Sequence, residues 1–168
     1  MSKKIQLKNV RLSFPSIFNK SVFDGKEGKY EATFLLSKED VKTKKRIDEL
    51  IQEVLREAKI KVNADKICVK DGDDVEYDGY ADNWSIKASS KLRPTVVNKD
   101  KSAIIEDDEI IYAGCYVNAI IDFWVQNNSY GKRVNANLYG IQFVKDGEPF
   151  GKNDIDVVDE FEDIDDEL

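Results

Sequence analysis

Flat aromatic rings and cationic side chains are interspersed along the stretch WSIKASSKLRPTVVNKDK, which begins at residue 84. Six of its side chains are candidate ligand contacts, namely Trp84, Lys87, Lys91, Arg93, Lys99 and Lys101. Cations follow the phosphate backbone of a nucleic-acid strand, while flat rings stack on its bases with about 1–3 kcal/mol per base. The stretch therefore indicates a surface for single-stranded nucleic acid. Trp84 fits equally well in a core beside Ile86 and Ala88, so both interpretations stay open.

A second set of rings and cations lies on a predicted hairpin between residues 113 and 144. In the segment 113–126, alternating residues such as Val117, Ile121 and Phe123 already supply a core face. The rings on the opposite face are then available for stacking, with packing against the rest of the protein as the alternative. The candidates on this hairpin are Tyr116, Trp124, Tyr130, Lys132, Arg133 and Tyr139.

The end of the chain is strongly acidic. Nine of the fifteen residues 154–168 are Asp or Glu, and none is Lys or Arg. This composition is typical of a disordered, solvated segment, yet apolar residues recur through it. We expect a tail that mimics a run of phosphates, competes for a cationic groove and docks on a partner protein. The residues assigned to partner binding are Asp159, Glu160, Phe161, Glu162, Asp163, Asp165, Asp166 and Leu168.

Charge is divided unevenly between this tail and the rest of the chain. The whole sequence has 26 basic and 33 acidic side chains, a net charge of −7. Without the nine tail acids, residues 1–153 hold 26 basic and 24 acidic side chains, or about +2. We therefore expect a slightly basic domain at 1–153 and an acidic tail at 154–168. A DNA mimic or a pure protein adaptor would carry its acids on the body, so the charge argues against that alternative.

The chain has no histidine, which excludes catalytic groups and zinc sites built on that residue. Asp71, Asp73, Asp74 and Asp78 cluster in one acidic stretch, so a metal-dependent nuclease using Asp, Glu and Lys is the alternative function. Their spacing does not match a Ca²⁺-binding loop. We expect no catalytic residue, no metal and no cofactor.

Cys68 and Cys115 are far apart and lack a metal-binding spacing, so we expect reduced, buried thiols. The N-terminus shows no signal-peptide pattern, and no run of 18 apolar residues occurs. These observations predict a soluble protein of the cytoplasm with no membrane partner.

Strands are predicted wherever apolar residues alternate, at 5–14, 29–36, 84–91, 113–126 and 134–144, with a shorter one within 93–105. The alternation in the first strand changes phase near Lys8 and Asn9, which predicts a bulge. The new phase places Phe14 on the core face. We expect loops at 71–83 and 127–133.

One amphipathic helix is predicted at 38–59, where apolar residues recur at i, i+3 and i+4. Ser37 is its expected N-cap, with Asp40 completing a capping box. Several strands and one helix favour a small β-barrel over an α/β fold.

Four stretches occur in order along the chain: VRLSFPSIF, GKYEATFLLSKED, WSIKASSKLRP, and YAGCYVNAIIDFW followed by GKRVNANLYGIQFVKDGEPFG. In these residues the chain resembles a family of phage-encoded single-stranded DNA-binding proteins long catalogued as a domain of unknown function. The resemblance implies a mostly β fold, namely an OB-like five- or six-stranded β-barrel with one packed amphipathic helix and a disordered acidic tail.

The resemblance also implies a function. Members of the family bind single-stranded DNA without catalysis and largely independently of sequence, in phage DNA replication and recombination. We expect the same in the cytoplasm of the infected bacterial host, with a homodimer and with the tail recruiting replication or recombination proteins. Related proteins tend to end this tail on an aromatic residue. This chain ends on Leu168, and its tail aromatic, Phe161, lies seven residues inside.

Overall fold

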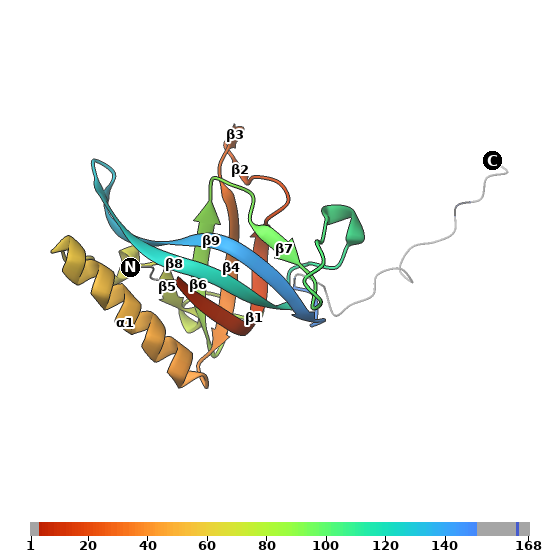
Figure 1. Ribbon diagram of the computed structural model, residues 1–168, viewed down its shortest axis with the longest axis horizontal. Coiled ribbons are helices and arrows are strands. Elements are labelled where there is room, and N and C mark those ends of the chain that lie inside the picture. The colour runs from red at the N-terminus through yellow and green to blue at the C-terminus, as the bar shows by residue number, and fades with distance from the viewer. Residues whose placement is uncertain (1–3, 151–163, 165–168) are drawn as a thin grey trace.

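Five strands form a closed ring at the centre of the protein (Figure 1). The structure, a computed structural model, describes residues 4–150 and Ile164. In order around the ring, the strands are β1 (Lys4–Ser16), β4 (Tyr30–Ser37), β6 (Asn83–Ser90), β9 (Gly131–Lys145) and β8 (Tyr116–Asn128). All neighbours are antiparallel except β6 and β9, which close the ring in parallel where Ser89 pairs with Asn137. This five-stranded barrel confirms the predicted OB-like fold.

Short strands and turns complete the barrel. They are β2 (Val22–Phe23), β3 (Lys26–Glu27), β5 (Val69–Asp71) and β7 (Thr95–Val97), with 3₁₀ turns η1 (Ala64–Lys66), η2 (Gly72–Asp74) and η3 (Glu106–Asp108). β5 lies along β6, and the amide of Cys68 donates to the carbonyl oxygen of Val134 on β9 at 3.0 Å. Residues 67–71 therefore fill the space where β6 and β9 diverge.

The core lies inside the ring, where inward residues alternate with outward ones. Ala32 and Phe34 on β4, and Val117 and Ile121 on β8, are at most 1% exposed. The predicted core faces of segments 29–36 and 113–126 are therefore confirmed. Since these apolar residues point inward, polar residues such as Glu31 and Thr33 on β4 and Asp122 on β8 lie on the outer faces of the same strands.

Two irregularities bend β1. The pairing with β8 shifts register between Leu7 and Val10, which confirms the predicted bulge, and both of these residues are buried. A second shift, in the pairing with β4, lies between Ser13 and Ser16. Here the prediction for Phe14 is wrong: the side chain is 57% exposed, because the irregular backbone turns it away from the core.

The helix α1 (Val41–Ala58) packs Ile47, Leu50, Ile51 and Val54 against one end of the barrel (Figure 1). It begins three residues later than predicted, and the prediction of Ser37 as N-cap is wrong. Ser37 ends β4, whereas the carboxylate of Asp40 accepts hydrogen bonds from the amide of Thr43 at 3.2 Å and from its hydroxyl at 2.8 Å. The N-cap is therefore Asp40.

Two predicted segments are narrower than expected. The strand within 93–105 is confined to β7, and the hairpin loop at 127–133 is a turn at 129–130, because β8 and β9 continue their pairing to Asn128 and Gly131. The tail residues Asp159, Glu160, Phe161, Glu162, Asp163, Asp165, Asp166 and Leu168 lie outside the described residues. The domain boundary at 153/154 stays a prediction for the same reason.

Candidate nucleic-acid interface

A groove of about 640 Å³ runs over the outer face of β4 and β6. Its floor consists of polar residues that alternate with the buried ones, namely Glu31, Thr33, Ser85, Lys87 and Ser89. Its walls come from the connection between β1 and β4, the loop 75–80, the segment 65–71 and the start of β9. On an OB barrel this strand face and its adjoining loops are where oligonucleotides bind.

Positive charge dominates the groove. Five cationic side chains line it, namely Lys29, Lys66, Lys70, Lys87 and Arg133, against the three acids Glu31, Asp65 and Asp71. Asp71 is occupied by an ion pair with Lys38 at 2.6 Å, and this contact holds the pKa of the Asp71 carboxyl below its usual value. Lys87 is 3.6 Å from Glu31, and its side chain remains 65% exposed. The groove can therefore attract a polyanion.

Exposed aromatic rings border the groove at Phe14 and Tyr77, each 57% exposed. Their ring centroids are 5.2 Å apart, and the two rings meet edge to face. Tyr80 packs beneath them, with its centroid 5.2 Å from that of Tyr77. Flat, exposed rings beside a cationic groove are the pattern that binds single strands.

The cysteine in the groove is not a nucleophile. Burial raises the pKa of the Cys68 thiol to about 12 and also raises that of Cys115. Since the thiolate is the reactive form, both thiols stay protonated and inert near neutral pH. Neither forms a disulfide.

Two of the residues selected from the sequence, Lys87 and Arg133, line the groove together. Lys132 and Tyr130 lie at the tip of the β8–β9 hairpin, where Tyr130 is 86% exposed. Trp124 faces outward on β8 and pairs with Asn135, which lines the groove. Their contacts with nucleic acid stay predictions, but their positions are compatible with one binding surface.

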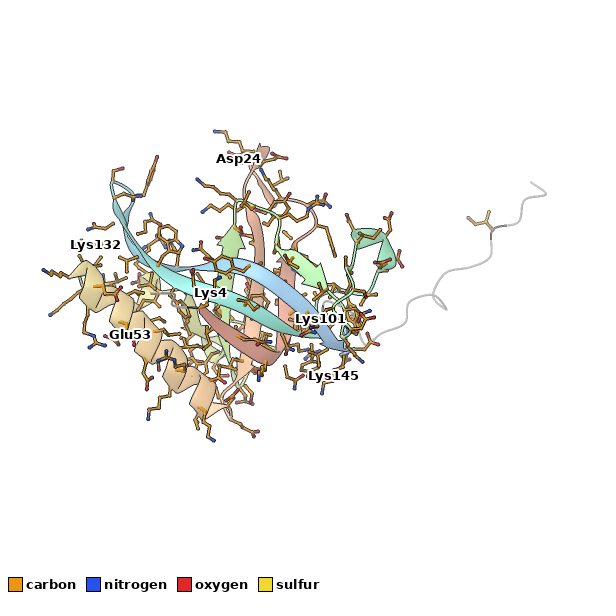
Figure 2. All side chains as sticks on the ribbon, in the orientation of Figure 1. Lys4, Asp24, Glu53, Lys101, Lys132 and Lys145 are labelled. Atoms are coloured by element: carbon orange, nitrogen blue, oxygen red, sulfur yellow. The ribbon has the colours of Figure 1, made fainter. Side chains whose placement is uncertain are left out.

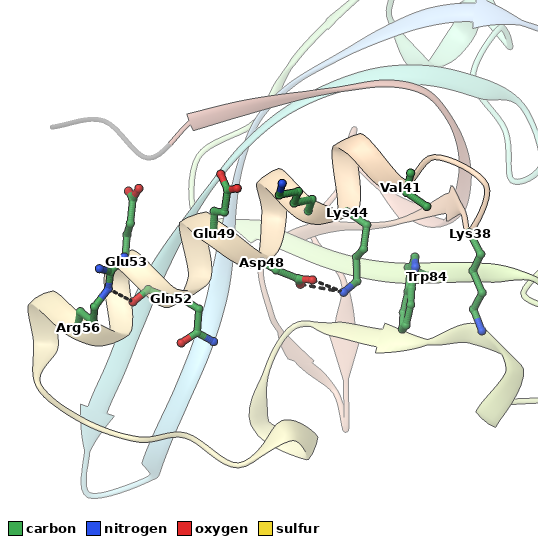
Figure 3. A pocket seen from close by; sticks show the side chains of 10 residues that line it. Lys38, Val41, Lys44, Asp48, Glu49, Gln52, Glu53, Arg56 and Trp84 are labelled. Atoms are coloured by element: carbon green, nitrogen blue, oxygen red, sulfur yellow. Dashed lines mark hydrogen bonds and ion pairs between the residues drawn. The ribbon is translucent and has the colours of Figure 1, made fainter.

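Trp84 lies elsewhere, beside α1 (Figure 3). Its ring stands between two ammonium groups, with Lys44 Nζ 4.3 Å and Lys38 Nζ 4.9 Å from the ring centroid. The side chain is partly buried against the core. This position fits the packing interpretation of Trp84, and a stacking contact with nucleic acid stays a prediction.

The other selected cations are spread over the surface. Figure 2 shows Lys132 and Lys101 toward opposite ends of the molecule. Lys99 lies near Lys101 in the turn after β7, with its Nζ 5.8 Å from the centroid of Phe143. Arg93 extends over Tyr30 at 5.9 Å, and the adjacent Lys91 is exposed. None of these four lysine and arginine side chains at positions 91–101 lines the groove.

Two selected tyrosines also point to other surfaces. Tyr116 lies between Arg11 and Lys145, at 5.8 Å and 4.7 Å from its ring centroid. Tyr139 donates a hydrogen bond to Asp122 at 2.7 Å, which raises the pKa of its hydroxyl, and Lys4 covers its ring at 4.6 Å. Both rings are already engaged by the protein's own charges.

Sequence reasoning missed five groove residues: Phe14, Lys29, Lys66, Lys70 and Tyr77. The three lysines come from separate segments and form no local cluster in the sequence. Tyr77 lies in the acidic stretch 71–83, which contains no cation to mark it as a nucleic-acid contact. A usable signal was the OB topology itself, because the residues flanking its second and third strands form the binding face.

The acidic stretch proposed for the nuclease alternative binds a lysine. Lys38 Nζ is 2.6 Å from both Asp71 and Asp73, and these contacts raise the pKa of Lys38 and lower those of the two carboxyls. Within residues 4–150, no group of three or more His, Cys, Asp or Glu side chains is arranged to hold a metal ion. In the same part of the chain, no helix is long and apolar enough to cross a membrane.

Known proteins resemble this chain along nearly its whole length. Residues 3–168 match the family model described as the single-stranded DNA-binding protein of Enterobacter phage Enc34. Protein p50 of Acyrthosiphon pisum secondary endosymbiont phage 1 is 38% identical over 173 residues, which cover 96% of this chain and 94% of that protein.

Two solved structures are also similar. The single-stranded DNA-binding protein from bacteriophage Enc34, in complex with single-stranded DNA, matches with a TM-score of 0.82 and 37% identity, covering 89% of this chain and 90% of that one. The single-stranded DNA-binding protein gp2.5 of bacteriophage T7 matches with a TM-score of 0.64 over 96% of each chain. At 15% identity, the second likeness shows the fold alone. The expected homodimer stays a prediction.

Proposed function

Because the chain belongs to the family of the Enterobacter phage Enc34 single-stranded DNA-binding protein, we propose that it binds single-stranded DNA in the groove over β4 and β6. The family confirms the resemblance drawn from the sequence and identifies a binding protein rather than an enzyme. The observation that supports this site is the gathering of five cationic side chains in one groove on the oligonucleotide-binding face of an OB barrel.

The groove has the chemistry of sequence-tolerant binding. The cations contact phosphates, which are the same for every sequence. The floor offers hydroxyl groups from Thr33, Ser85 and Ser89, which adapt to donors and acceptors alike. Binding through phosphates and ring stacking therefore discriminates little among bases.

We further propose a role in phage DNA replication and recombination, in the cytoplasm of the infected bacterial host. The acidic tail would compete with DNA for the groove and recruit replication or recombination proteins. The support is the charge division, since nine carboxylates follow a body of about +2 and can return to its cationic groove.

Charge-removing variants test the groove. Lys87→Ala and Arg133→Ala are each expected to weaken binding several-fold at low salt and to reduce the salt slope of binding by about 0.7 per lost phosphate contact. Fluorescence anisotropy of a labelled oligonucleotide, titrated at several salt concentrations, measures both quantities. Lys42→Ala is the matched control, because Lys42 is exposed on α1 and does not line the groove.

Two outcomes would contradict the site. One is unchanged affinity and salt slope in both groove variants, and the other is an equal loss in Lys42→Ala. Lys99→Ala in the same assay tests a contact selected from the sequence that lies outside the groove, and we expect at most a small loss.

A further inference from the structure

One wall of the groove over β4 and β6 is the loop 75–80, which we call the wall loop. The core holds it at one end only, where the side chain of Tyr80 is 4% exposed. All residues from 73 to 78 are exposed, so burial does not hold this stretch in place. The position of the wall loop therefore depends on contacts made outside the core.

A single lysine joins the two ends of the segment 71–82. Lys38 Nζ donates hydrogen bonds to the carboxylates of Asp71 and Asp73, each at 2.6 Å. The amide of Lys38 also donates to the carbonyl oxygen of Asp82 at 3.0 Å. The Asp73 carboxylate in turn accepts from the amide of Asp82 at 2.8 Å. We call these four residues, Lys38, Asp71, Asp73 and Asp82, the clasp.

The backbone beside the clasp is closely packed. A Cβ at Gly72 would collide with the carbonyl oxygens of Tyr80 and Asn83, so only glycine lets the two ends of the segment approach this closely. The side-chain amide of Asn83 donates to the carbonyl oxygens of Gly79 at 3.0 Å and Ala81 at 2.9 Å. These contacts join the ends of the segment to each other, and the clasp joins both ends to the barrel.

Lys38 belongs to a fixed part of the fold. It follows Ser37, the last residue of β4, and lies in the short connection to α1. Its Nζ stands 4.9 Å from the ring centroid of Trp84 (Figure 3). Lys38 does not line the groove, whereas its partner Asp71 does. An effect of Lys38 on DNA in the groove would therefore be indirect.

We propose that Lys38 is a positioning residue for DNA binding, which holds the wall loop against the groove through Asp71 and Asp73. The inference rests on the proposed function and gives the acidic stretch 71–83 a part in it. A protein whose binding-competent state is only partly populated has a lower apparent affinity in proportion. Opening the clasp would therefore weaken DNA binding without removing any contact with DNA.

Lys38→Met removes the ammonium group and keeps an unbranched side chain. It is expected to weaken binding of single-stranded DNA about fivefold, as for a wall loop that is in place in about a fifth of the molecules. The salt slope should stay unchanged, because no phosphate contact is lost. Lys38→Arg should retain the affinity, since a guanidinium group can donate to both carboxylates. Anisotropy titrations at several salt concentrations measure these quantities.

Asp73→Ala separates positioning from charge. It removes an acid beside the cationic groove, so a purely electrostatic effect would tighten DNA binding. Loss of the clasp should instead weaken binding about fivefold, as in Lys38→Met. Asp74→Ala is the matched control, because it removes the same charge at the next residue, which takes no part in the clasp. Its affinity should equal or slightly exceed that of the wild type.

Hydrogen exchange of the free protein gives a readout that does not depend on DNA. The amide of Tyr80 donates to the carbonyl oxygen of Tyr77 at 3.2 Å, and the amide of Asp82 donates to Asp73. Lys38→Met retains both acceptors, yet both amides are expected to exchange faster because the segment opens more often. Amides of the barrel core should exchange as in the wild type. Unchanged exchange at both amides would show that the clasp does not hold the wall loop.

The binding outcomes distinguish this inference from the proposed function. Wild-type affinity in Lys38→Met, together with weakened binding in Lys87→Ala, would overturn the positioning role and leave the groove standing. Tighter binding by Asp73→Ala, or a reduced salt slope in Lys38→Met, would overturn it as well. Unchanged binding in Lys38→Met and Lys87→Ala alike would defeat the proposed function itself. Thermal unfolding shows whether each variant is folded, and if Lys38→Met is not, the comparison of Asp73→Ala with Asp74→Ala decides.

Discussion

For single residues, the chemical type of a side chain did not predict the surface of the barrel on which the side chain lies. Trp84 and Trp124 are both candidate stacking rings in the sequence, and both fit that role by chemistry. The structure separates them, because Trp84 packs beside α1 between two lysines, whereas Trp124 faces outward next to a groove residue. The direction of a ring depends on the strand's register in the barrel, which the ring itself does not reveal.

This difference predicts which tryptophan reports DNA binding. Single-stranded DNA is expected to quench the protein's tryptophan fluorescence, and Trp124→Phe is expected to lose most of that quench. Trp84→Phe should retain it, since the ring beside α1 lies outside the groove. Fluorescence titration of the two variants measures this directly. A quench that disappears with Trp84 instead would show that DNA contacts the α1 side of the barrel.

At the scale of elements, periodicity located the strands and the helix, but their ends depended on competing hydrogen bonds. Ser37 and Asp40 are both good N-cap residues, and their spacing matches a capping box. Ser37 is already the last residue of β4, paired with Asn83, so the helix begins after Asp40. A neighbouring strand thus decides a boundary that local sequence leaves open.

The cap assignment has a measurable consequence. Asp40→Ala is expected to lower the free energy of unfolding by about 1 kcal/mol, because the amide of Thr43 loses its acceptor. Ser37→Ala is the matched control, with an expected cost of a few tenths of a kcal/mol. Urea denaturation of both variants measures the difference. A larger loss of unfolding free energy in Ser37→Ala than in Asp40→Ala would instead support Ser37 as the N-cap, as the sequence predicts.

At the scale of the whole molecule, charge is segregated. The nine carboxylates of residues 154–168 give the chain its net charge of −7. The groove over β4 and β6, by contrast, is lined by more cations than acids. A tethered polyanion has a high effective concentration at a nearby cationic site, and salt screens the attraction. Binding of DNA by the full-length protein should therefore depend on displacing the tail.

Deleting residues 154–168 is expected to tighten binding of single-stranded DNA, with the largest gain at low salt. The matched control keeps the tail's length and replaces its Asp and Glu residues by Asn and Gln, which should reproduce the gain. Anisotropy titrations of the three proteins at low and high salt measure it. Equal or weaker affinity after deletion would show that the tail does not compete for the groove.

The fold class and the sign of the body's charge could both be predicted from the amino-acid sequence. Apolar alternation in the segments 29–36 and 113–126 indicates which face is buried, because the side-chain period of a strand is two. Composition alone separated the acidic tail from the slightly basic domain. The stretches shared with a phage family then indicated the ligand.

The proposed binding groove itself depends on contacts between segments that are distant in the chain. Lys29, Lys66, Lys87 and Arg133 lie in four separate segments, and barrel closure brings them into one groove. Phe14 was assigned to the core because alternation continued through it, yet a bulge set by pairing with β4 turned its ring outward beside Tyr77. Barrel closure and bulges arise from contacts between residues distant in the chain. Local hydrophobic periodicity therefore does not predict them.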